Sequence, residues 1–233
     1  HGGHLFVRVQ CLNIMGDRYA IGIDEVGRGP LAGPLCVGAC LARTPFSLEF
    51  SETFSSIRDS KQLTTRKREE WFCRIAKAAE SEECRWSTVF VSEKVIDRRG
   101  LSYALRKAIN TVLKKLGATP ESSDIFLDGG IKAPRAFRSQ QTIIRGDEKV
   151  PLIAGASIMA KVLRDLHMVR LGKRYPVYGF ERHKGYGTKA HYTALKKYGI
   201  SPVHRRSFLT KFQAPNTPPA NRRAGKLQTI SKL

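Results

Sequence analysis

The chain has 233 residues, enough for one sizeable core with a small appendage but too few for two large independent domains. Hydrophobic residues make up 41% and charged residues 26%, as in ordinary globular proteins, and no run of roughly 18 apolar residues offers a membrane-spanning helix. The formal net charge of +21 favours a polyanionic partner, with nucleic acid first. Charge alone does not separate an enzyme from a passive binder or a basic structural protein.

Cysteine usage and the N-terminus indicate a reducing, cytoplasmic location. The five cysteines are odd in number and include no C-x-x-C pair, so neither a disulfide framework nor a zinc knuckle is expected. Residues 1–16 lack the charged, apolar and small-residue sections of a secretory signal. We therefore expect a cytoplasmic protein with no membrane partner.

The first 150 residues predict strands that alternate with helices. A strand at residues 19–24 runs into a glycine-rich turn and is followed by a second strand at 35–42. Apolar residues at helical spacing predict amphipathic helices. In chain order, the next expected elements are a helix at 65–79, a strand at 86–91, a helix at 101–116, and strands at 124–128 and 141–145.

The character of the sequence changes in its last third. A proline-free helix is expected at 152–171, and from Lys173 onward basic and aromatic residues are interleaved before another helix at 189–198. Residues 213–233 contain three prolines and no acidic residue, which predicts a flexible basic tail. The predicted units are thus an extension at 1–16, the main domain at 17–172, a helical nucleic-acid-binding region at 173–212 and the tail at 213–233.

Four acidic side chains follow the expected strands. Asp24 and Glu25 end the first strand, Asp128 ends the strand at 124–128, and Asp147 follows the strand at 141–145. Neighbouring strand residues point to opposite faces, so Asp24 and Glu25 share one site only if the strand breaks there. The glycines and proline at residues 27–30 predict that break.

Two interpretations of these carboxylates stay open on spacing alone. Each aspartate could cap a helix or start a turn. Alternatively, the four groups could converge on a pair of hard divalent cations such as Mg²⁺, which prefers oxygen ligands and would offset the repulsion between crowded carboxylates.

Several segments, in order, resemble the signature of one enzyme family. The run G-I-D-E-V-G-R-G-P-L-A-G-P at residues 22–34 resembles that of the type 2 ribonucleases H, the ribonuclease HII family. The other matches are D-S-K-Q-L at 59–63, L-D-G at 127–129, R-G-D at 145–147, A-S-I-M-A-K-V-L-R-D at 156–165, G-Y-G-T-K-A-H at 185–191 and H-R-R-S-F at 204–208.

This resemblance implies an α/β fold, an RNase H-like mixed β-sheet flanked by helices, with a small helical C-terminal region. It implies that Asp24, Glu25, Asp128 and Asp147 are the catalytic residues and ligate two Mg²⁺ or Mn²⁺ ions. The implied partners are RNA/DNA hybrids and DNA duplexes with embedded ribonucleotides, which the enzyme cleaves on the 5′ side of a ribonucleotide, and a monomer is expected.

The resemblance also implies how the ribose is recognised. The main chain of Gly27, Arg28 and Gly29 would contact the 2′-hydroxyl, which is the only sugar difference between RNA and DNA. Tyr186 would bond the same hydroxyl, with an aromatic packing role as the alternative. Two further residues, Lys61 and Ser157, would contact flanking phosphates, although solvated or packing roles stay open.

Some features depart from the pattern or leave rivals. Gly187 stands where the family has proline, which should loosen the loop that holds Tyr186. The residues before Met15 match nothing in the family and suggest a vector remnant. A binding protein of the same fold without chemistry is one rival; ribonuclease HIII is another, although it normally carries an N-terminal binding domain. For His183, His191 and His204 we expect loop or packing positions, and for Asp165 an ion pair or a cap.

Overall fold

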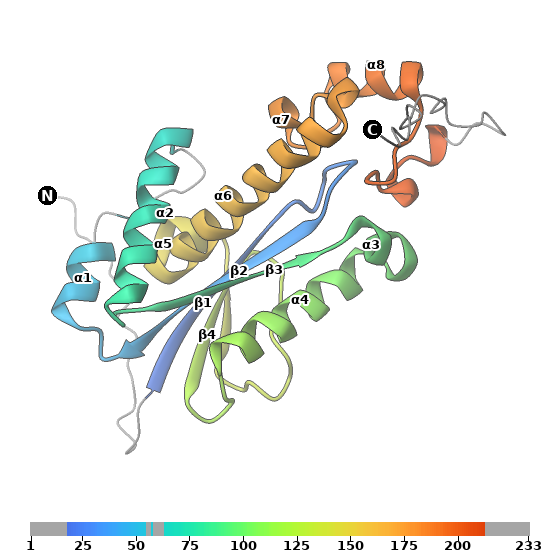
Figure 1. Ribbon diagram of the computed structural model, residues 1–233. Helices are drawn as coiled ribbons and strands as arrows, with labels where there is room; N and C mark the ends of the chain where they lie inside the picture. The colour runs from blue at the N-terminus through green and yellow to red at the C-terminus, as the bar shows by residue number, and fades with distance from the viewer. Residues whose placement is uncertain (1–17, 55–56, 58–62, 213–233) are drawn as a thin grey trace, which may run out of the picture.

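The computed structural model describes residues 18–54, 57 and 63–212. Its centre is a five-stranded mixed sheet with the strand order β3-β2-β1-β4-β5 (Figure 1). The first three strands form an antiparallel meander, and β4 and β5 then add in parallel on the other side of β1. The strands are β1 (Arg18–Val26), β2 (Leu35–Thr44), β3 (Arg85–Val91), β4 (Ser123–Asp128) and β5 (Gln140–Ile143).

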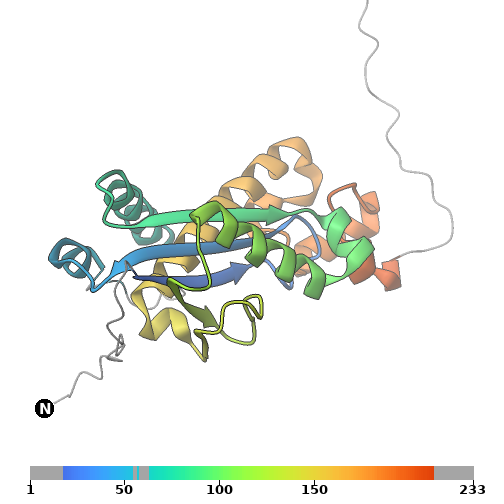
Figure 2. The same cartoon turned by 90° about the horizontal axis from the view of Figure 1, so that it is seen from below.

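Helices cover both faces of this sheet (Figures 1 and 2). On one face α4 (Leu101–Leu116) packs with α3 (Glu93–Arg99) against the apolar residues of β1 and β2 that include Ile21 and Ile23. On the other face lies α6 (Pro151–Arg174), flanked by α1 (Leu48–Phe54) and α2 (Thr65–Glu80). The alternation of strand side chains thus divides the core into two layers.

The long helix α6 lies unusually close to the sheet. A Cβ built on Gly22 of β1 would be 2.2 Å from the main chain of Leu152, and one on Gly38 of β2 would be 2.3 Å from that of Ala156. Only glycine fits at these two positions, because any side chain would collide with helix backbone. The glycines therefore set how near α6 comes to the strands that carry the site.

The C-terminal region packs on the far end of α6 and on the loop after β1. Leu31 and Ala32 of that loop and Met168 of α6 share an apolar cluster with this region. Since α6 continues to Arg174, the predicted boundary between residues 172 and 173 falls within its last turn. The region contains α7 (Phe180–His183), α8 (Lys189–Tyr198) and the 3₁₀ helices η1 (Pro176–Tyr178), η2 (Arg206–Phe208) and η3 (Thr210–Phe212).

The predicted strands and the four predicted helices are confirmed, with ends that differ by up to three residues. The α/β class with a mixed sheet flanked by helices is also confirmed. Short helices were missed, namely α1, α3, α5 (Gly146–Lys149) and α7, because a stretch of four to seven residues carries too little periodicity to detect. Among the described helices, none combines the length and the apolar character needed to span a membrane.

Candidate active site

Two aspartates lie side by side at the ends of the central parallel strands. The register of β1 and β4 pairs Ile23 with Leu127, so the next residues, Asp24 and Asp128, stand at the same level. Both side chains are on the face of the sheet covered by α6, since Ala20 and Phe126 at even-numbered positions belong to that layer of the core. The pairing of two parallel strands therefore creates an acidic centre under the first half of α6.

The surroundings of this centre disfavour the ionised form of Asp24. Asp24 is only 4% exposed, and burial raises the pKa of its carboxyl to about 7, with the charges of Glu25 and Asp128 adding to the rise. Hydrogen bonds from the Ser157 side chain and from the Glu25 main-chain N–H, at 2.7 Å, oppose this shift. Carboxylates in such a site are costly to ionise together without a cation.

Glu25 does not share the arrangement of Asp24. The expected break in the strand is wrong, because β1 pairs regularly with β2 through Val26 and Glu25 lies opposite Val37. Regular alternation turns Glu25 toward the opposite face, where its Oε1 accepts a hydrogen bond from Arg28 Nη1 at 3.1 Å. The glycine-rich turn begins at Gly27, two residues after Glu25, which is too late to bring the Asp24 and Glu25 side chains to the same face.

Asp147 also has a different setting from the expected one. The strand β5 ends at Ile143, Arg145 adopts a left-handed conformation with φ 55°, and Asp147 lies in the first turn of α5, buried at 1% exposure. The N–H of the preceding Gly146 donates to Asp128 Oδ1 at 2.7 Å. The residue before Asp147 is thus brought to Asp128 by a helical turn and not by the end of a strand.

The donor set suits a hard divalent cation. Carboxylate oxygens are the ligands that Mg²⁺ and Mn²⁺ prefer, and burial together with the neighbouring charges of Glu25 and Asp128 raises the pKa of the Asp24 carboxyl. Within residues 18–54, 57 and 63–212, however, no group of three or more His, Cys, Asp or Glu side chains stands ready to hold a metal ion. Glu25 lies on the opposite face, and Asp147 does not complete such a group with the two strand aspartates, so Asp24 and Asp128 form the nucleus of any such site.

Two loops meet beside the acidic centre: the glycine loop, residues 27–34 after β1, and the Tyr186 loop, residues 184–188 before α8. A Cβ built on Gly29 would be 4.0 Å from Cε1 of Tyr186, whose side chain is 42% exposed. The Leu31 N–H donates to the Gly185 carbonyl at 2.8 Å, which joins the two loops directly. Gly27 has a φ of +91°, a conformation that favours glycine. The two loops for which the family resemblance implies ribose recognition are therefore neighbours in the fold.

The Tyr186 loop is packed on its other side by Tyr192. A Cβ on Gly187 would lie 2.9 Å from the Tyr192 hydroxyl and 3.2 Å from Leu31 Cδ1. The Thr188 N–H also donates to the Tyr186 carbonyl at 2.8 Å. A tyrosine ring thus occupies space that a larger residue at position 187 would need, and the loosening expected from Gly187 stays a prediction.

The two predicted phosphate contacts have different outcomes. Ser157 is 8% exposed on α6 and its side chain bonds Asp24, so it orients a carboxylate; a contact with phosphate stays a prediction. Lys61 and nearly all of the D-S-K-Q-L segment lie outside the described residues. Asp165 forms an ion pair with Lys161 at 2.8 Å, one turn away on α6, as its expected role required.

Three histidines form a packed cluster away from the carboxylates. His183 stacks on His191 at 4.4 Å between ring centroids, and His191 Nε2 lies 3.0 Å from His204 Nε2. Burial lowers the pKa of His204 to about 3, and the neighbouring His191 contributes. The cluster holds the Tyr186 loop through its carbonyl, which lies 2.9 Å from His191 Nδ1, and this confirms the expected packing role.

Comparison with known proteins agrees with this geometry. A mixed sheet with carboxylates at the ends of adjacent parallel strands is the arrangement of an RNase H-like nuclease. The chain belongs to the ribonuclease HII family, since the profile described as Ribonuclease HII matches residues 21–211. It is therefore a ribonuclease H, a hydrolase that acts on RNA/DNA hybrids.

The relatives cover most of the chain. Ribonuclease HII from Caldicellulosiruptor bescii is 42% identical over 83% of this chain and 88% of its own length. Ribonuclease HII from Nitrosomonas europaea is 42% identical over 80% of this chain and 81% of its own length. Among solved structures, ribonuclease H2 from Pyrococcus horikoshii superposes with a TM-score of 0.66 at 26% identity, covering 83% of this chain and 96% of its own.

Proposed function

We propose that the chain is a metal-dependent endoribonuclease that hydrolyses the RNA strand of hybrids and nicks duplex DNA on the 5′ side of embedded ribonucleotides. The observation that supports this proposal is that Tyr186 lies against the glycine loop. This loop directly follows β1, the strand that carries Asp24. A scissile phosphate over the carboxylates would bring its ribose to this pair of loops. One site then combines hydrolysis with recognition of the sugar.

The carboxylates would bind two Mg²⁺ or Mn²⁺ ions. When bound, such ions supply an activated water and neutralise charge on the departing 3′ oxygen. Asp24 and Asp128 hold the centre from adjacent strands, Ser157 orients Asp24, and the Gly146 N–H orients Asp128. In this proposal Asp147 and Glu25 complete the ligand set, Glu25 only after its side chain leaves Arg28 and turns round the end of β1 to the face of Asp24.

Recognition of the ribose follows from the exposed surface of the two loops. In this proposal the main chain of Gly27, Arg28 and Gly29 contacts the sugar, and the approach is close at the exposed Gly29 because no Cβ shields the backbone there. The exposed Tyr186 ring beside Gly29 supplies a hydroxyl for the 2′-oxygen and a face for the sugar. Basic residues of the C-terminal region add sequence-independent affinity for phosphates.

Duplex DNA with a single ribonucleotide is expected to be nicked in Mg²⁺ or Mn²⁺ and to stay intact in EDTA. The reason is that the site offers carboxylates in place of a protein nucleophile, so the reaction depends on added cations. Gel analysis of an end-labelled duplex measures both arms. A chain that binds the duplex in metal but never nicks it would be a silent binding protein, and cutting in EDTA would contradict the metal requirement.

Tyr186→Phe is expected to reduce kcat/KM for a single embedded ribonucleotide by about tenfold, since one hydrogen bond to the 2′-oxygen is lost. Binding of the duplex should change less than twofold, as ring and backbone contacts remain. Steady-state cleavage and a fluorescence binding titration measure the two quantities. Tyr103→Phe on α4, under the Arg99 guanidinium, is the matched control. Equal losses of cleavage and binding would favour a packing role for Tyr186.

A further inference from the structure

Two arginines are completely enclosed near the glycine loop. Arg164 of α6 and Arg205, directly before η2, are each 0% exposed. Within the part of the chain that the structure describes, the hydrogen-bond acceptors of both guanidinium groups are main-chain carbonyls. Removal of a cation from water is costly, and an apolar side chain would fill the same space more cheaply. Their burial needs an explanation beyond packing.

Arg205 binds the glycine loop at three points. Its Nη2 donates to the Gly27 carbonyl at 2.6 Å, its Nη1 to the Arg28 carbonyl at 2.8 Å and its Nε to the Gly33 carbonyl at 3.0 Å. The planar fork of the guanidinium can serve diverging acceptors in one rigid geometry, which a lysine cannot do. The two ends of the loop are thereby tied to a single side chain.

This geometry fixes the direction of two amide N–H groups. In a trans peptide the C=O and the N–H point in opposite directions. The peptides whose oxygens face Arg205 carry the N–H groups of Arg28 and Gly29, so these point away from the buried guanidinium. Both residues are exposed, and Gly29 adjoins the Tyr186 ring. Two main-chain donors are therefore presented at the surface where the ribose is expected.

Arg164 joins this loop to the one that carries Tyr186. Its Nε donates to the Pro34 carbonyl at 2.9 Å and its Nη1 to the Lys184 carbonyl at 3.1 Å. A Cβ on Gly27 would lie 2.2 Å from the same Nε, so Gly27 must be glycine for the arginine to fit. Arg164 thus links the glycine loop to the Tyr186 loop, in addition to the direct hydrogen bond between Leu31 and Gly185.

We propose that Arg205, with Arg164, is a positioning residue that holds the Arg28 and Gly29 amides in place for the ribose 2′-hydroxyl. The inference deepens the proposed function and rests on it. A charged donor on each carbonyl also polarises the peptide and strengthens its N–H as a donor. The discrimination between ribose and deoxyribose then depends on two side chains that never touch the substrate.

The test compares the affinities of the full chain for two duplexes in EDTA, where no cleavage competes. One duplex contains a single ribonucleotide and the other is the same sequence in DNA. Arg205→Lys should lower the preference for the ribonucleotide duplex by about tenfold, because a lysine reaches one carbonyl in place of three. Affinity for the DNA duplex should stay within about twofold, since phosphate contacts are unchanged.

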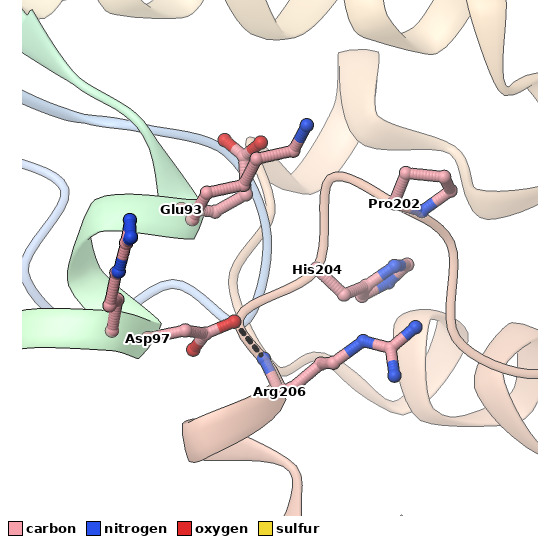
Figure 3. Close-up of a pocket in the computed structure, with 7 residues that line it drawn as sticks. Glu93, Asp97, Pro202, His204 and Arg206 are labelled. Atoms are coloured by element: carbon pink, nitrogen blue, oxygen red, sulfur yellow. Dashed lines mark hydrogen bonds between the residues drawn. The ribbon is translucent and has the colours of Figure 1, made fainter.

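Asp97→Ala is the matched control. The Asp97 carboxylate of α3 accepts three hydrogen bonds from the segment next to Arg205, from Arg206 N at 2.9 Å, Ser207 N at 3.0 Å and Ser207 Oγ at 2.6 Å. Figure 3 shows the bond to Arg206 in the cleft between α3 and this segment. The variant loses as many hydrogen bonds as Arg205 makes but leaves the glycine-loop carbonyls untouched. Its preference for ribonucleotides should equal that of the unmodified chain.

Distinct outcomes separate this inference from the proposed function. The positioning role alone would be overturned by any of three results. Arg205→Lys could keep the full preference for the ribonucleotide duplex, or it could lose affinity for both duplexes equally. Asp97→Ala could also lose as much of the preference as Arg205→Lys does. A native chain that neither nicks nor prefers the ribonucleotide duplex would overturn the proposed function and this inference with it. Thermal melts check folding, and Arg164→Lys provides the same test through the second arginine if Arg205→Lys does not fold.

Discussion

Asp128→Asn is expected to lower the rate of cleavage by at least about three orders of magnitude while the chain still binds its duplex. The amide keeps the shape of the side chain, and its oxygen can still accept the Gly146 N–H at the end of β4. It loses the negative charge that a divalent cation needs from this position. Single-turnover cleavage and a binding titration on the same ribonucleotide duplex measure the two effects.

Asp124→Asn is the control for this substitution. Asp124 lies on the same strand and pairs with Arg18 at 2.7 Å, at the end remote from the acidic centre. The change should weaken the fold slightly and leave cleavage within about twofold of the native rate, because this partly exposed ion pair contributes little. A comparable loss of cleavage in both variants would show that Asp128 acts through the stability of β4 and not through the reaction.

The sheet could be predicted from the sequence because its strands have distinctive composition and end in strong turns. Local patterns also located Asp24 and Asp128, since each follows a run of apolar strand residues and precedes a glycine-rich turn. Their adjacency depends on the strand order and register, which are non-local and became an expectation only through family resemblance. The parallel pairing of β1 with β4, across about 100 residues of chain, is what places them side by side.

Other parts of the site escaped prediction for identifiable physical reasons. The side chains of β1 continue to alternate between the two faces of the sheet past Asp24, because β2 offers backbone partners as far as Val26. The glycines of the turn therefore predicted the end of the strand too early. Asp147 lies in a helical turn too short to leave a periodic signal. Arg164 and Arg205 look like surface cations in a chain of net charge +21, and no local pattern distinguishes enclosed arginines from solvated ones.

Asp24→Asn is expected to stabilise the metal-free protein at neutral pH by roughly 1–3 kcal/mol while removing its activity. Burial raises the pKa of Asp24 to about 7 from its ordinary value of 3.8. The native state therefore binds a proton that the unfolded chain releases, and the free energy of unfolding falls as pH rises from about 4 to about 7. Asparagine has no such proton, so the advantage of the variant should be near zero at pH 4 and complete above pH 7.

Chemical denaturation at several pH values in EDTA measures this difference, and Mg²⁺ or Mn²⁺ should reverse its sign. A cation that binds only the folded state stabilises the native chain by mass action, whereas the variant has lost a ligand and should gain little. Asp124→Asn provides the contrast: its carboxylate is paired with Arg18, so its removal should destabilise with or without metal. If Asp24→Asn is instead destabilising in EDTA, its carboxylate supports the fold through hydrogen bonds. The ionised carboxylate of Asp24 would then not destabilise the metal-free fold.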